Sequence, residues 1–224
     1  MTETQTPELT PTIVDPFEIV HVTNPGIIEG KLPDDLYQNL LSICLDPEVR
    51  KNSASNKSVA SIKEIANFPL DTEDKSFHKY LGAMFQSWIE LHDIPLPEVA
   101  INAGVVDCWI NYQKKGEFAP IHTHPEAIHF VVWMKIPFEN EVETDATSCG
   151  KLPNFQLKNS TFELTYNSLG ADLMTHTFNL GKEDEGKVIM FPGKIAHQMY
   201  PFFTSDEECI TICGLMMMFR ADQQ

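Results

Sequence analysis

Basic side chains are scarce in this sequence. The 224 residues hold 16 lysines and arginines against 32 aspartates and glutamates, which gives a formal net charge of −16 at pH 7. A field of this sign repels phosphate backbones, because binding to nucleic acid depends largely on contacts between basic side chains and phosphates. We therefore do not expect a nucleic-acid partner.

Long apolar runs and a secretion signal are also missing. No window approaches the roughly 18 apolar residues of a membrane-spanning helix, and the first residues, MTETQTPELTPT, contain neither a basic nor an apolar region. The cysteines form no CxxC pair, which disfavours a zinc site built on thiolates, and three of them lie in apolar runs, as reduced buried thiols do. We expect a soluble cytoplasmic protein without a membrane partner. The cysteines are Cys44, Cys108, Cys149, Cys209 and Cys213.

The apolar periodicity changes along the chain, although the length suits one structural domain. Residues 1–15 are rich in Thr, Pro and Glu and predict a flexible tail. Residues 16–98 predict a support region with a strand near 17–22, a helix that starts near Leu32 and ends by about Asp46, and a second helix over 72–92. Residues 99–220 alternate with period two and predict about eight short strands. Helices followed by strands indicate an α+β fold, a jelly-roll or cupin-like sandwich with N-terminal helices buttressing one sheet.

Three histidines are candidates for a metal site. His122 and His124 are one residue apart, so both imidazoles leave an extended strand from the same face, and His197 follows a second strand-like run. Neutral imidazoles from two strands can hold a divalent transition metal and leave its other positions open. The spacings from Gly116 to His122 and from Gly186 to His197 resemble the two cupin motifs, G(x)5HxH and G(x)5P(x)4H. That resemblance implies a double-stranded β-helix.

His129 is a further candidate for a catalytic residue. It lies on the predicted strand 128–136, where alternation puts His129, Trp133 and Lys135 on one face. A histidine there could act as a substrate-facing acid or base, support a metal ligand, or simply pack with one hydrogen bond.

Four blocks of the chain resemble the Fe(II)/2-oxoglutarate-dependent oxygenase superfamily, and most closely a small branch that is frequent in bacteriophages. The resemblance covers roughly residues 99–218 and implies Fe(II), 2-oxoglutarate and O2 as cofactors, with hydroxylation of an unknown prime substrate. It also places the protein in the host cytoplasm if a phage encodes it. The blocks are WINYQ at 109–113, EFAPIHTH at 117–124, FVVWMKIP at 130–137, and the segment 191–202 that contains FP, the late histidine and PF.

Two positions depart from the superfamily's pattern. Its usual metal triad has two histidines and one carboxylate, whereas His124 stands where the carboxylate is expected, and Glu126 is the alternative acid. We favour three histidine ligands. The superfamily also commonly presents an Arg-x-Ser pair to the distal carboxylate of 2-oxoglutarate, where this chain has Cys209 and Thr211. A thiol does not replace a guanidinium in holding a carboxylate.

The resemblance suggests Lys135 as the replacement cation, because other members use a lysine about a dozen residues after the first metal motif. Thr211 keeps a hydroxyl contact, and Asn111 or Tyr112, whichever faces inward, adds a polar one. The alternative for Lys135 is a strand-end side chain that reaches solvent.

Three interpretations of function follow from these residues. The first is a non-haem Fe(II), 2-oxoglutarate-dependent oxygenase. The second is a three-histidine cupin-type metalloenzyme that does not use 2-oxoglutarate, and the third is a non-catalytic β-sandwich that binds a partner or serves as structure. An exposed edge strand of such a sandwich would also allow a homodimer.

Overall fold

The computed structural model describes residues 26–54, 61–71, 73–91, 101–124, 128–146, 158–168 and 172–220. Its larger sheet contains, in spatial order, β1 (Ile28–Lys31), β8 (Lys187–Pro192), β5 (Ile128–Lys135), β10 (Cys209–Arg220), β3 (Ile101–Gln113) and β2 (Ile65–Asn67). Its smaller sheet contains β4 (Ala119–His122), β9 (Ala196–Met199), β6 (Thr161–Asn167) and β7 (Leu173–Asn179). The helices are α1 (Asp34–Leu45), α2 (Pro47–Lys51), α3 (Ser76–Leu91) and α4 (Asn140–Ala146), with a short 3-10 helix at Lys182–Asp184.

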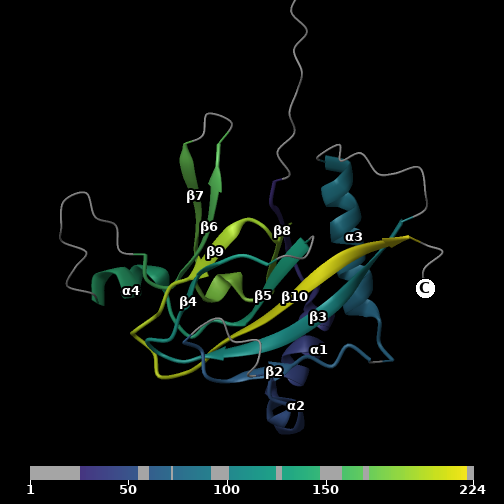
Figure 1. Cartoon of the computed structure of the whole chain (residues 1–224). Coiled ribbons are helices and arrows are strands. Elements are labelled where there is room, and N and C mark those ends of the chain that lie inside the picture. The colour runs from purple at the N-terminus through teal and green to yellow at the C-terminus, as the bar shows by residue number, and fades with distance from the viewer. Residues whose placement is uncertain are drawn as a thin grey trace, which may run out of the picture.

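From β3 onward the chain passes back and forth between the two antiparallel sheets. β3, β5, β8 and β10 enter the larger sheet, whereas β4, β6, β7 and β9 enter the smaller one. The long strands β3 and β10 lie side by side across the molecule (Figure 1). This exchange of strands is the double-stranded β-helix, so the predicted fold class is confirmed.

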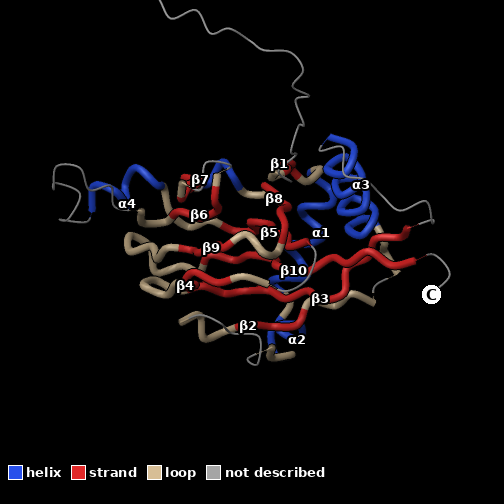
Figure 2. Tube along the Cα trace, turned by 45° about the horizontal axis from the view of Figure 1, so that its top comes forward, coloured by secondary structure: helices blue, strands red, loops and turns tan. Residues whose placement is uncertain are grey.

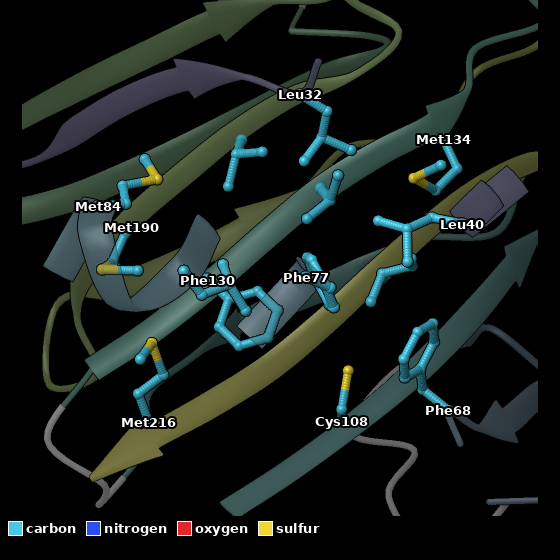
Figure 3. Packing of buried hydrophobic residues seen from close by; sticks show 14 of the residues in the cluster. Leu32, Leu40, Phe68, Phe77, Met84, Cys108, Phe130, Met134, Met190 and Met216 are labelled. Atoms are coloured by element: carbon cyan, nitrogen blue, oxygen red, sulfur yellow. The ribbon is translucent and has the colours of Figure 1, made fainter. Parts of the chain in front are cut away.

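The N-terminal helices cover the outer face of the larger sheet (Figure 2). Leu36, Leu40 and Cys44 recur at four-residue intervals, which puts them on one buried face of α1. From α3, Phe77 packs edge-on against Phe130 of β5 with ring centroids 6.0 Å apart, and Figure 3 shows these rings within the cluster between helices and sheet. The predicted buttress is therefore present.

A second apolar cluster lies between the two sheets and surrounds the histidines. Val131 and Trp133 enter it from β5, Leu164 from β6 and Cys213 from β10. Since alternate residues of a strand point to opposite faces, each central strand of the larger sheet contributes to both clusters. Apolar side chains fill the space between the two sheets, except where polar side chains interrupt the cluster.

The two motif glycines both adopt left-handed backbone. Gly116 has φ 78° and Gly186 has φ 86°, values that side chains with a Cβ rarely tolerate. Gly116 makes the turn that leads into β4, and Gly186 makes the turn that leads into β8. The glycines thus set the tight turns that the cupin-like spacing predicts.

Several elements differ from the sequence-based expectation. β1 and β2 come from the support region but pair with β8 and β3, so the region 16–98 contributes strands to the larger sheet. The sequence analysis predicted neither of these strands, nor α2, α4 or β4 as short elements. The expected tail at 1–15 and the expected strand near 17–22 lie outside the described residues. None of the helices in the described part of the chain has the length and apolar content needed to cross a bilayer.

Candidate metal centre

Two of the candidate ligands sit opposite each other in the smaller sheet. His122 of β4 and His197 of β9 are registered cross-strand partners. His124 lies just beyond the end of β4, where its backbone N–H donates to the carbonyl of Gly193 at 2.8 Å. The turn before β9 thus fixes His124 beside the other two histidines.

The three imidazoles converge on one point. Their ring centroids are 4.2 Å apart for His122 and His197, 5.1 Å for His122 and His124, and 5.2 Å for His124 and His197. One ring nitrogen of each lies within 4.8 Å of the others. Because a bond from a histidine nitrogen to a metal such as zinc is about 2.1 Å long, small side-chain shifts bring all three onto one ion.

Hydrogen bonds orient two of these rings. Nδ1 of His122 lies 2.7 Å from the carbonyl of Pro120, and Nδ1 of His197 lies 3.0 Å from the carbonyl of Ile195. A carbonyl only accepts, so Nδ1 carries the proton and Nε2 keeps its lone pair. Nε2 of His197 is buried without a hydrogen-bond partner. Metal-ligating histidines usually show this pattern, and a divalent ion would satisfy the orphaned nitrogen.

The same surroundings keep the imidazoles neutral. Burial, followed by the neighbouring His122, lowers the pKa of His197 to about 3. Burial also lowers the pKa of His122 below its ordinary value. Metal binding requires the neutral ring, so these ligands would not have to lose protons near pH 7.

His129 is the fourth histidine of this cluster. Its ring centroid is 4.4 Å from that of His124 and 4.9 Å from that of His197, and the ring stacks on Trp109 at 6.0 Å. Its Nδ1 is buried without a hydrogen-bond partner, and burial holds the pKa of His129 well below its usual range. It is not among the three whose nitrogens come together. His129 is therefore placed as a neutral hydrogen-bonding group beside the metal site.

A cavity of about 60 Å³ extends from the histidines into the sandwich. Its apolar wall includes Val131 and Phe162, and its polar wall consists of Asn111, Gln113 and Thr211. The amide of Asn111 donates to Oγ1 of Thr211 at 3.3 Å. Alternation along β3 could have predicted Gln113, since it lies two residues after Asn111. The described lining residues include no lysine or arginine.

The structure places two of the predicted co-substrate residues, Lys135 and Tyr112, away from the cavity. Lys135 forms an ion pair with Glu207 at 2.7 Å and lies outside the cavity. A β-bulge opposite Ile210 and Thr211 puts two successive residues of β5 on the outer side, so the alternation that pointed Lys135 inward breaks. Tyr112 faces the helices and donates to the carbonyl of Cys44 at 2.8 Å.

The position of the expected arginine is filled by a buried thiol. Cys209 is 1% exposed and packs in the inter-sheet cluster. Burial raises the pKa of Cys209 far above its usual value, so the group is a neutral thiol. Of the predicted co-substrate residues, the structure brings Asn111 and Thr211 to the cavity. Glu126, the alternative acid ligand, lies outside the described residues.

A family model covers the strands that carry this site. Residues 107–213 match the family described as "Putative 2OG-Fe(II) oxygenase". This segment, just under half of the chain, is similar to the Fe(II)/2-oxoglutarate oxygenase superfamily. The match implies Fe(II), 2-oxoglutarate and O2 as cofactors and a dioxygenase reaction, and the histidine cluster fits the metal. No curated protein sequence matches this oxygenase significantly.

Solved structures share the fold of this oxygenase. A Pseudomonas putida prolyl-4-hydroxylase superposes with a TM-score of 0.52 at 14% identity, covering 86% of this chain and 92% of that one. A prolyl hydroxylase from Trichoplax adhaerens, solved with a peptide fragment of the hypoxia inducible factor oxygen degradation domain, gives 0.51 at 13% identity, covering 85% and 84%. At these identities the likeness shows the double-stranded β-helix alone.

Proposed function

We propose that this oxygenase holds Fe(II) on His122, His124 and His197 and hydroxylates an aliphatic C–H group of a prime substrate. The observation that carries the proposal is the convergence of three ring nitrogens within 4.8 Å of one another, at the end of a buried cavity. Three protein ligands on one side of the ion leave its remaining positions open to co-substrate and oxygen.

The chain's own residues prepare this site before any ligand arrives. The carbonyls of Pro120 and Ile195 hold the Nδ1 protons and aim Nε2 of two ligands inward. Val131 and Phe162 give the cavity an apolar wall that limits access of water. Bound iron with 2-oxoglutarate and O2 supplies the oxidising power that converts C–H to C–OH. His129 stays neutral and positions the substrate or co-substrate by a hydrogen bond.

We propose a prime substrate other than nucleic acid, acted on in the cytoplasm. The net charge of −16 opposes binding of a phosphate backbone. The described cysteines, Cys44, Cys108, Cys209 and Cys213, are free and buried, which supports a reducing compartment. The closer resemblance to a phage-associated branch stays a prediction.

Iron retention tests the ligand assignment. Protein prepared without a histidine tag is loaded with Fe(II) under anaerobic conditions, desalted and analysed for metal. Wild type should retain about one iron per chain, and His197→Ala should retain almost none, since it loses a direct ligand. His176→Ala is the matched control, because His176 is an exposed histidine of β7. Equal retention by wild type and His197→Ala would refute the assignment.

Release of succinate tests the reaction. Iron-loaded wild type, given 2-oxoglutarate, ascorbate and O2 without a prime substrate, should release succinate slowly, and His197→Ala should not. The described cavity lining contains no lysine or arginine, which favours one competing function, a three-histidine metalloenzyme that does not use 2-oxoglutarate. Full iron retention without any succinate release would support that competitor instead.

A further inference from the structure

β7 is an edge strand whose outer side has no paired strand in the described part of the chain. It is the last strand of the smaller sheet and pairs with β6 on its other side. Every second residue of an edge strand directs its backbone N–H and C=O away from the neighbouring strand, so β7 presents a row of these groups along its open side. The hairpin of β6 and β7 projects from the body of the sandwich in Figure 1. A further strand can therefore reach this side.

β7 lacks the features that usually protect an edge strand. It has seven residues and contains no charged side chain and no proline. By contrast, β1 carries Glu29 and Lys31, and β2 and β4 have three and four residues. The side chains of Leu173 and Met174 in β7 are 72% and 43% exposed. Since charges, prolines and short length are the common means of preventing contact between edges, nothing in β7 opposes pairing.

The sequence of β7 is nearly the same in both directions. LMTHTFN reversed is NFTHTML, so the central Thr-His-Thr is unchanged and Met174 exchanges places with Phe178. Two antiparallel copies of β7 centred on His176 would place Thr175 opposite Thr177 of the second copy. They would also place Met174 opposite Phe178 of the second copy. Threonine pairs and apolar pairs stabilise antiparallel strands, so β7 is self-complementary, as a two-fold interface requires.

This register also matches the two faces of the sheet. Alternation puts His176 and Phe178 on the face toward the larger sheet, where Phe178 belongs to the inter-sheet cluster. Thr175 and Thr177 lie on the outer face, where Oγ1 of Thr177 donates to Glu163 at 3.2 Å. Two paired copies would therefore keep the apolar pairs on the inner face and the threonine pairs on the outer face.

Charge favours a second copy at this edge over contacts elsewhere on the surface. The chain carries a net charge of −16, so most contacts between two copies bring like charges together. β7 holds none of these charges, and the neighbouring carboxylate of Glu163 is engaged by Lys158 and Gln198. Pairing at β7 thus avoids most of the repulsion.

A groove beside β7 connects this edge with the metal centre. Leu173 and His176 line a groove of about 890 Å³ that also includes Ile121, the residue before His122. A strand added to β7 would lie along the rim of this groove.

We propose that two copies of this chain associate through β7, antiparallel about a two-fold axis at His176, so that their smaller sheets form one sheet of eight strands. The second copy would then border the groove next to each metal centre. The association depends on neither metal nor 2-oxoglutarate, so it stands apart from the proposed reaction.

Sedimentation equilibrium of the full-length, metal-free chain tests the association. Over about 1–100 μM, wild type should show a concentration-dependent equilibrium between the 25.4 kDa monomer and a dimer. Thr175→Glu should weaken the dimer about tenfold or more, because it places two carboxylates at diagonal positions across the axis. Thr175→Ser keeps the hydroxyl and should associate as wild type does. Thr175 is exposed, so each variant should keep the melting temperature of the monomer.

Charge complementation tests the register. Fluorescently labelled Thr175→Glu is mixed with unlabelled Thr177→Lys, and sedimentation of the label is followed. In the proposed register the new carboxylate faces the new ammonium group, so the mixture should associate about tenfold or more tightly than Thr175→Glu does with itself.

Four results would overturn the inference. Wild type could remain monomeric over the whole range, Thr175→Glu could associate as wild type does, or the mixture could fail to restore association. The fourth result concerns the uncharged residues 101–106 of β3, which β2 leaves uncovered in the described structure. If Val106→Glu abolished the dimer and Thr175→Glu did not, the association would belong to that edge instead.

Discussion

Replacing His197 by leucine should make the protein as stable as wild type or more stable when metal is absent, and less stable than wild type when metal is bound. The buried imidazole has an orphaned Nε2 and one hydrogen bond, from Nδ1 to the carbonyl of Ile195. Removing the orphan gains about 1–3 kcal/mol and losing the bond costs about 0.5–1.5 kcal/mol. Phe162 and Phe191 lie beside the ring and would pack against leucine. Metal-free His197→Leu should therefore equal wild type or exceed it by about 1 kcal/mol.

Metal should change this order. An ion that binds only the folded state at 100 times its dissociation constant adds about 2.7 kcal/mol to wild type. For a chain of this size, that gain raises the melting temperature by about 5–11 °C. His197→Leu lacks a ligand and should show almost no shift. This change in the order of stability is an example of the trade-off between stability and function, in which the residues of a functional site lower the stability of the metal-free protein.

Thermal unfolding with and without Mn(II), which does not undergo oxidation as readily as Fe(II), measures both effects. His129→Leu is the control, because it also removes a buried orphaned nitrogen but not one of the three converging ligands. It should keep the metal-induced shift. The reasoning fails if wild type melts at the same temperature with and without metal, or if His197→Leu keeps the full shift.

Two further predictions concern the scaffold. A Cβ built on Gly214 would meet the Phe130 ring at 2.3 Å and the carbonyl of Asp107 at 2.7 Å, so Gly214→Ala should cost about 1–3 kcal/mol in chemical denaturation; an unchanged midpoint would contradict the close approach. Hydrogen bonding from Arg50 lowers the pKa of Glu64 from 4.5 to about 2. The folded state thus favours the ionised carboxylate, and its contribution is present above pH 4.5 and lost as pH falls toward 2. Acid unfolding of Glu64→Gln should depend less on pH over that range, and an identical profile would contradict this.

The convergence of the histidines could be anticipated because it depends on local spacing. His122 and His124 share a face by alternation, and the left-handed turn at Gly116 that leads into their strand is signalled by the glycine itself. The late His197 needed the fold as well, since only pairing of β4 with β9 brings it opposite His122.

The residues predicted to contact the co-substrate were harder to place from the sequence, for a physical reason. Alternation assigns faces correctly until a bulge inserts a residue, and the bulge opposite Ile210 turned Lys135 outward. For Asn111 and Tyr112, alternation shows only that the two side chains face opposite sides of β3. Which of them faces the cavity depends on the packing of Tyr112 against the helices, which the sequence pattern does not show. The short strands β1 and β2 carry too few residues for a periodic signal, so their pairing is visible only in three dimensions.

The pairing of β4 gives the metal a mechanical role. β4 has four residues, lies at the edge of the smaller sheet, and joins β9 through an irregular ladder that ends at His122 and His197. An ion bound to both imidazoles would cross-link β4 and β9 at the end of that ladder. Amide hydrogens of β4 should then exchange slowly in the metal-loaded protein and quickly in the metal-free one. Metal binding would therefore make this edge of the smaller sheet more rigid.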